Sequence, residues 1–258
     1  MKKLVFISII VLGVLTSGFT QEAVPASNSP VKREAREDML LMNFNWTSLL
    51  NTGDTVTVKP YSWGYDLKLM YDVPIQNSNF SFALGGGLGI ANYYTNSEIK
   101  HYNLETDSSQ SFFIPIANSR NVKGNKLTIT YADIPFELRY RSDPDKHGYS
   151  WKIAVGFKVG YHLQTKTKIK ETVMVQDGYT ITGENSPEDD QDVDPVNKEV
   201  KSKSYYYPNY EKWRYGLNVR VAYGRVGLNA FYSATSIFDE DKGARVNPIS
   251  IGITLMPF

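Results

Sequence analysis

Residues 62–74 read SWGYDLKLMYDVP, and apolar and polar side chains alternate along this stretch without interruption. A β-strand points successive side chains to opposite faces, so the pattern predicts a strand with one apolar face and one polar face. The apolar face carries aromatic residues near its ends and leucines between them. This order is typical of membrane-crossing strands, because Trp and Tyr prefer the headgroup level. The stretch therefore predicts a transmembrane β-strand.

The same alternation recurs along the chain and predicts eight strands. They cover about residues 39–47, 62–74, 80–91, 127–140, 151–164, 213–223, 226–234 and 249–255. Each alternating core is close to the roughly 9–11 residues that a tilted strand needs to cross a bilayer. Eight is the smallest even number of strands used by outer-membrane barrels. We therefore expect an all-β fold, an eight-stranded antiparallel up-and-down transmembrane barrel.

The lengths of the connections predict the orientation of this barrel. Three of them are short, at residues 74–78, 141–150 and 224–225. The other four are longer, at residues 50–61, 93–125, 165–210 and 235–247. Outer-membrane barrels have short periplasmic turns and long extracellular loops, so both ends of the barrel chain should be periplasmic. The alternative is a soluble lipocalin-like barrel with the apolar rows inside, and the order of aromatic and aliphatic residues argues against it.

The first 38 residues are expected to lie outside the barrel domain, which would span residues 39–258. Residues 1–20 have the basic start, short apolar run and small-residue end of a cleaved signal peptide. Residues 21–38 are polar and contain proline, which favours a flexible periplasmic tail. The chain has no cysteine, which excludes both disulfides and a lipidation cysteine. These features predict export to the outer membrane, and the net charge of +1 gives no argument for a nucleic-acid partner.

The polar faces of the predicted strands would line the lumen. Eight of the charged residues on these faces are Asp66, Lys68, Asp133, Glu137, Arg139, Lys158, Arg214 and Arg220. An eight-stranded barrel is only wide enough for its own side chains, and buried charges must be paired, so we expect a mutually paired polar plug rather than a pore. A proton or ion path is the alternative. Gly85, Gly87 and Gly89 should make room for large facing side chains such as Arg139 or Arg220.

The apolar faces of the same strands would contact lipid. The residues chosen to represent these faces are Trp63, Leu67, Phe82, Phe157 and Leu217. A shift of one residue in the phase of any strand would turn its side chain inward, so the direction of these five tests the whole prediction.

Catalytic residues are sparse. The chain has three histidines, and His162 falls on an inward face, where a hydrogen-bonding role is the simplest interpretation. There is no G-x-S-x-G elbow, so nucleophilic catalysis has no strong support and we expect no enzyme and no cofactor. A lipid-modifying barrel enzyme is the alternative function, and it would need a Ser–His pair facing lipid at the outer rim.

One acidic segment has a spacing related to metal loops. Asp190, Asp192 and Asp194 repeat the alternate carboxylates of calcium-binding loops. Pro195 stands where such a loop needs glycine, and Lys201 stands where it needs its last acid. The segment therefore predicts weak calcium binding at most.

One strand and its successor resemble a known family. Residues 131–140, YADIPFELRY, and the glycine-rich stretch 156–170 resemble strands of the PorT-type outer-membrane β-barrel proteins of the Bacteroidota. The resemblance implies an outer-membrane barrel, and some members of that family serve type IX secretion. With a filled lumen and no catalytic motif, we expect a structural or interaction protein, a subunit or accessory of an envelope complex such as type IX secretion, with a protein partner bound through the extracellular loops or the periplasmic tail.

Overall fold

The computed structural model describes residues 39–54, 56–76, 78–103, 109–117, 120–176, 179–181, 196–205 and 209–257. The regular elements of this part of the chain are all strands. They are β1 (Leu40–Leu50), β2 (Trp63–Pro74), β3 (Phe80–Tyr94), β4 (Ser97–Asn103), β5 (Ser109–Pro115), β6 (Asn121–Arg141), β7 (Trp151–Gln176), β8 (Tyr179–Ile181), β9 (Val196–Ser204), β10 (Trp213–Tyr223), β11 (Val226–Ser233) and β12 (Asn247–Leu255). Among the described residues, no helix has the length and apolar character needed to span a membrane.

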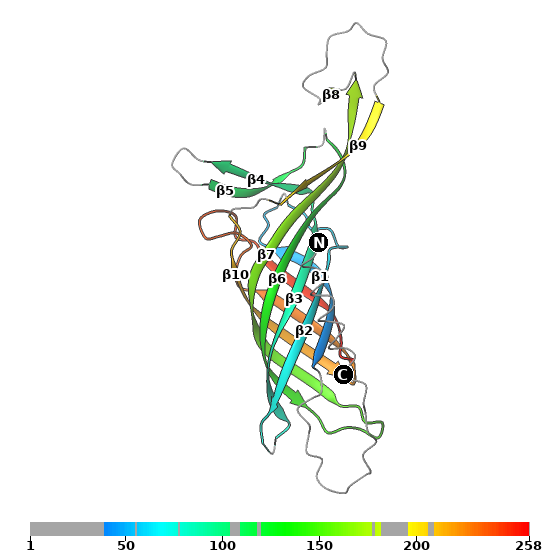
Figure 1. The fold of residues 1–258 in the computed structure, drawn as a ribbon, viewed down its shortest axis with the longest axis vertical. Coiled ribbons are helices and arrows are strands. Elements are labelled where there is room, and N and C mark those ends of the chain that lie inside the picture. Colours follow the sequence, from blue (N-terminus) through cyan, green and yellow to red (C-terminus); the bar gives the residue numbers. More distant parts are fainter. Residues whose placement is uncertain are drawn as a thin grey trace, which may run out of the picture. The chain divides into compact units, whose positions relative to one another are not determined.

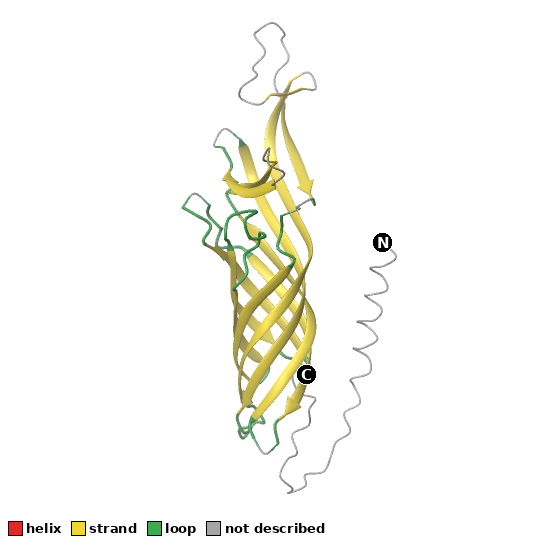
Figure 2. Ribbon diagram, turned by 90° about the vertical axis from the view of Figure 1, so that its left-hand side faces the viewer, coloured by secondary structure: helices red, strands yellow, loops and turns green. Residues whose placement is uncertain are grey.

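Eight of these strands form a closed antiparallel barrel, as predicted. Their order is β10-β11-β12-β1-β2-β3-β6-β7, and pairing of β7 with β10 closes the ring. The first and last strands of the barrel are neighbours, with Met42 opposite Leu255. Figures 1 and 2 show the strands side by side and inclined to the barrel axis.

The two ends of the barrel differ in their connections. At one end, the turn end, the chain reverses within residues 75–79, 142–150 and 224–225. Gly224 has a φ of 59°, the left-handed conformation that a two-residue hairpin turn requires. At the other end, the loop end, the remaining connections carry β4, β5, β8 and β9 (Figure 1).

The two faces of the barrel wall have opposite chemistry. In β10 buried and exposed residues alternate without a break, with Trp213, Leu217 and Val221 on the exposed face. The buried face of the same strand carries Arg214 and Arg220. The apolar side chains therefore point outward and the charged ones inward, which is the reverse of a soluble lipocalin-like barrel.

Aromatic side chains gather at two levels of the outer face. Near the loop end Trp63 lies against Tyr65, and Tyr161 meets Trp213 edge-on with ring centroids 5.1 Å apart. Near the turn end the ring centroids of Trp151 and Tyr223 lie 5.2 Å apart. We call these levels the loop-end girdle (Trp63, Tyr65, Tyr161, Trp213 and Tyr215) and the turn-end girdle (Tyr71, Tyr140, Trp151 and Tyr223). The aliphatic side chains between them form a band suited to the hydrocarbon core.

Two connections predicted as loops contain regular strands. Residues 93–125 hold the β4–β5 hairpin and the start of β6, which begins at Asn121 rather than near residue 127. Residues 165–210 hold the second half of β7, which pairs with β6 on one side and with β9 on the other. The sequence did not predict these strands, because the regular alternation of apolar and polar residues is lost where a strand extends beyond the membrane.

Candidate functional site: the filled lumen and the loop end

The charged side chains of the lumen come from the inward rows of β2, β6, β7 and β10. All eight predicted lumen residues are on these rows, and all except Asp66 are buried. The register places them in layers: Asp133 and Arg214 each lie opposite Gly160, whereas Glu137 and Asn218 each lie opposite Gly156. The lumen charges therefore form two clusters, one above the other.

The cluster nearer the loop end is centred on Asp133. Nη2 of Arg214 donates to both Asp133 carboxylate oxygens, at 2.7 and 2.9 Å, and Nζ of Lys158 lies 3.1 Å from Oδ2. The Arg214 guanidinium also lies 3.8 Å from the ring centroid of Tyr131, and the Lys158 ammonium lies 3.9 Å from that of Phe231. One carboxylate and two aromatic faces thus compensate two buried cations.

The second cluster is centred on Glu137. Nε of Arg139 and Nη2 of Arg220 both donate to Oε2 at 2.9 Å, and Nδ2 of Asn218 donates to Oε1 at 3.1 Å. Asp72 lies farther toward the turn end, with one oxygen 3.8 Å from Nη1 of Arg139. Glu137 is therefore the principal counter-charge of two buried guanidinium groups.

Asp66 joins the charged half of the lumen to an uncharged half. Its Oδ2 accepts hydrogen bonds from Nδ2 of Asn43 and Asn45, at 3.3 and 3.2 Å, and lies 3.6 Å from Nζ of Lys68. Asn43 in turn accepts a bond from the Thr254 hydroxyl at 2.8 Å. The three adjacent strands β11, β12 and β1 contain no charged residue at all. We call their side of the lumen the neutral sector.

Apolar clusters cover the charged layers at both ends. The turn-end cluster consists of Leu41, Met70, Ala83, Ala222 and Met256. The loop-end cluster consists of Leu49, Tyr93, Leu127, Ile129, Tyr131, Tyr210, Ile237, Phe238 and Val246. A cavity of about 20 Å³ beside Asp66 and Lys158 is enough for about one water molecule. The lumen is therefore filled and capped.

The loop-end cluster is built by loops that fold over the barrel mouth. Phe238 in the β11–β12 loop is buried and packs edge-on against Phe113 of β5 and Tyr210, with centroid distances of 5.5 and 5.1 Å. The backbone N–H of Ser111 donates to the carbonyl of Lys242 at 2.8 Å, which ties the β4–β5 hairpin to the same loop. The hairpin and the β11–β12 loop together form a lid.

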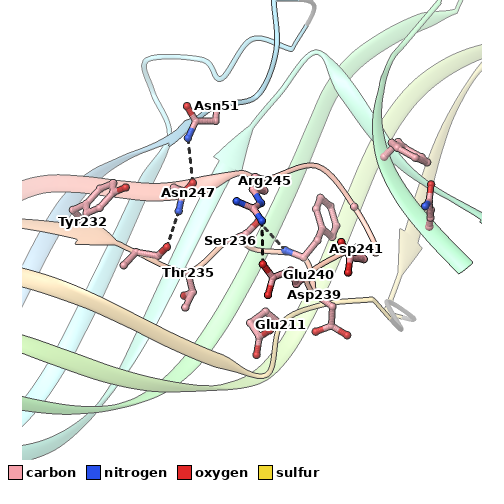
Figure 3. A pocket seen from close by; sticks show the side chains of 15 residues that line it. Asn51, Glu211, Tyr232, Thr235, Ser236, Asp239, Glu240, Asp241, Arg245 and Asn247 are labelled. Atoms are coloured by element: carbon pink, nitrogen blue, oxygen red, sulfur yellow. Dashed lines mark hydrogen bonds and ion pairs between the residues drawn. The ribbon is translucent and has the colours of Figure 1, made fainter. Parts of the chain in front are cut away.

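A cleft of about 870 Å³ opens beside this lid (Figure 3). Its lining includes four carboxylates, those of Glu211, Asp239, Glu240 and Asp241. Glu240 pairs with Arg245 at 3.0 Å, Asp239 pairs with Lys242 at 3.2 Å, and Glu211 accepts the backbone N–H of Trp213. Three of these four acids therefore already interact with groups close to them in the chain.

The structure brings one serine and one histidine together. Nδ1 of His101 lies 2.6 Å from Oγ of Ser111 on the facing strand, and the same hydroxyl accepts a bond from Nδ2 of Asn209 at 2.9 Å. Ser111 is 0% exposed, so this hydroxyl cannot meet a lipid substrate at the barrel surface. His162, predicted to be a hydrogen-bonding residue, has Nε2 at 2.7 Å from Oγ1 of Thr165 and stacks on Tyr210.

The glycines of β3 leave room for large side chains, as predicted. The side chains nearest to a methyl group added at each position are Met70 at Gly85, Lys68 at Gly87, and Asp66, Asp133 and Arg214 at Gly89. The sequence did not predict that Gly156 and Gly160 of β7 also leave room for lumen side chains. Which charged residues face them depends on the register of β6, β7 and β10.

The other predicted residues divide between the surface and the undescribed part of the chain. Phe157 and Leu217 are 51% and 63% exposed on the outer face; Trp63 and Phe82 are also exposed, and Leu67 is half-buried in the same row. Asp190, Asp192 and Asp194, with residues 1–38, lie outside the described residues. Within the described residues, no cluster of three metal-ligating side chains occurs.

A closed barrel with an apolar band between two aromatic girdles and a polar, plugged interior defines a transmembrane β-barrel protein. The chain belongs to the outer membrane protein beta-barrel domain family, whose model matches residues 26–240. It is therefore an outer-membrane protein, with the turn end toward the periplasm and the loop end outside. No curated protein and no solved structure shows significant similarity to it.

Proposed function

We propose that this outer-membrane barrel is a structural or interaction protein, a subunit or accessory of an envelope complex. The observation that carries the proposal is the lumen, whose charges are paired with one another and covered by apolar clusters at both ends. A filled lumen leaves the protein's surfaces as the places where it can act. The lid and the projecting strands β7 and β9 offer such a surface at the loop end.

The likeness of residues 131–140 and 156–170 to PorT-type proteins makes type IX secretion the concrete form of this proposal. The test is affinity purification of the full chain from outer membranes in mild detergent, with mass spectrometry of the proteins that co-purify. A variant with residues 177–197 replaced by a short Gly/Asn turn should assemble and lose the partner. A variant lacking residues 21–38 is the matched control for the periplasmic side.

Three results would contradict parts of the proposal. If the wild type reproducibly co-purifies nothing, the interaction role is wrong. If the shortened variant fails to assemble, residues 177–197 belong to the fold rather than to a contact. If it keeps its partner and the variant without the tail loses it, the contact lies on the periplasmic tail.

Planar-bilayer recording tests the observation on which the proposal rests. The reconstituted protein should show no stable, large, open conductance, because apolar clusters close both ends of the lumen. Proteoliposomes from the same preparation should show the heat-modifiable folded form, which controls for insertion. A stable open pore would replace the structural role with transport.

A lipid-modifying enzyme receives no support from the described residues. The Ser–His pair formed by Ser111 and His101 joins the two strands of the β4–β5 hairpin, and its hydroxyl is fully buried. An enzyme of that class would need this pair at the lipid-facing rim.

A further inference from the structure

Lysines lie side by side on the strands that project beyond the loop-end girdle. Lys126 of β6 lies opposite Lys168 of β7, and Lys168 lies opposite Lys203 of β9. Lys170 lies opposite Lys201 in the next row. Directly opposed residues of an antiparallel pair point to the same side, so these side chains share one face. We call it the basic face, and define it as Lys126, Lys166, Lys168, Lys170, Lys201 and Lys203.

This arrangement is unfavourable for the isolated protein. Like charges placed directly opposite each other destabilise a sheet. Burial and then the neighbouring positive charges, first that of Lys170, lower the pKa of Lys168 below its ordinary value. Among the described residues, Glu199 is the one carboxylate paired with the basic face, 3.9 Å from Lys201. The face therefore presents a concentration of positive charge that an external anion would neutralise.

The basic face is a continuation of the lipid-facing surface. On β6 the residues that alternate with Lys126 are the buried Asn125 and Leu127, and the alternation runs without a shift to the outward Ile134 and Leu138. Lys126 thus points to the same side as the lipid-facing residues, beyond the loop-end girdle. The other face of β6, β7 and β9 lines a cavity of about 150 Å³ against the β4–β5 hairpin.

We propose that the basic face binds the phosphate groups of phosphorylated glycolipid headgroups in the outer leaflet. Tyr161 and Trp213 mark the headgroup level, and Lys166 follows Tyr161 closely on the same strand. Headgroup phosphates would therefore lie beside lysines that point away from the barrel axis. A soluble polyanion would explain the charge, but not its position in line with the lipid-facing row.

The test compares two lipids and two variants in binding measurements on the full chain in detergent micelles. The probes are bisphosphorylated lipid A and dephosphorylated lipid A with the same acyl chains. The test variant carries Lys126→Gln, Lys168→Gln and Lys203→Gln. The matched control carries Lys123→Gln, Lys146→Gln and Lys198→Gln, which removes the same number of positive charges elsewhere. Lys198 lies on β9, but its position in the alternation of the strand places it on the face opposite to that of Lys201 and Lys203.

The wild type and the control should prefer the bisphosphorylated lipid. The test variant should bind it about a hundredfold more weakly, since one lysine near an anionic surface contributes about fivefold. All three proteins should remain heat-modifiable, which shows that they are folded. This result is independent of the partner purification above, because it uses purified protein and defined lipid.

Several outcomes would overturn the assignment. One is equal binding of the two lipids by the wild type, and another is an equal loss in the control variant. Full competition by millimolar inorganic phosphate would indicate a free-phosphate site instead. A preference that appears only after the carboxylates of residues 184–194 are neutralised would mean that the chain's own acidic segment occupies the face.

Discussion

Asp133 and Arg214 form their ion pair across a strand that lies between them. Asp133 is on β6 and Arg214 on β10, and both lie opposite Gly160 of the intervening β7. Because Gly160 has no side chain, the two groups approach to 2.7 Å over its backbone. The missing side chain of one residue thus permits the contact of two others.

Substituting Gly160 by alanine should separate this pair. The new methyl carbon would stand 2.5 Å from Oδ1 of Asp133 and 3.1 Å from Nε of Arg214. We expect a loss of about 3 kcal/mol in the free energy of unfolding, the lower range for breaking a buried ion pair. Urea unfolding in micelles, followed by tryptophan fluorescence, measures it. Gly86→Ala is the control, since a methyl group there meets nothing within 4 Å; equal stability of the two variants would show that Gly160 does not serve the pair.

Glu137→Gln should destabilise the barrel more than any exposed charge change. Arg139 and Arg220 both donate to this carboxylate, and its neutralisation would leave two buried guanidinium groups poorly compensated. The expected cost is about 3–5 kcal/mol. The exposed Glu199→Gln is the control for loss of one carboxylate. Adding Arg220→Met to Glu137→Gln should recover part of the stability, and no recovery would mean that the residues do not act as a charge pair.

Phe157→Arg should impair insertion into a bilayer. Phe157 points outward and stacks on Phe136 with ring centroids 4.7 Å apart, between the two girdles. An arginine near the membrane midplane costs about 2–4 kcal/mol. The folded fraction in liposomes, read from the heat-dependent gel shift, should fall. Tyr102→Arg on the exposed β4 strand should insert like the wild type, and equal insertion of Phe157→Arg would contradict the lipid-facing assignment.

The lid should loosen in mild acid. Burial lowers the pKa of His101, so the closed lid favours the neutral ring. An opened hairpin would protonate near the ordinary value of about 6.5, so it gains protons first as the pH falls. Lid stability should therefore be constant above about pH 6.5 and decrease below it. Hydrogen exchange of β4 and β5, corrected for intrinsic rates, measures this at about pH 7.5 and 5.5. His101→Gln should remove the pH dependence, and an unchanged dependence would assign it to another group.

The positions of the strands within the membrane could be predicted because each strand has lipid on one face and the polar lumen on the other. The expected strand 213–223 coincides with β10, and its outward residues carry the apolar row. Alternation of this kind is local, so one chain is sufficient to recognise it. The closed eight-stranded barrel follows from the count and length of such segments.

Structure beyond the membrane and contacts inside the lumen could not be predicted in the same way. The second half of β7 begins with TKTKIK at residues 165–170, where nearly every residue is polar. No row of apolar residues therefore identifies it as a strand. The inward direction of Asp133 and Glu137 was predictable from phase. Their partners depend on the register of β6, β7 and β10, which places residues far apart in sequence at the same level.

The neutral sector has a consequence for the order of events during assembly. The charges of β6 find their compensation on β6 itself, β2, β7 and β10, whereas β1 and β12, which join the ends of the sheet, carry none. An open sheet can thus neutralise its charges before its first and last strands meet. The final step then brings no charged side chain of β1 or β12 into the lumen. A carboxylate at Asn43 would repel that of Asp66 on the adjacent β2, which now accepts a hydrogen bond from the Asn43 amide, so Asn43→Asp should slow folding into liposomes while the uncharged Asn43→Ser should not.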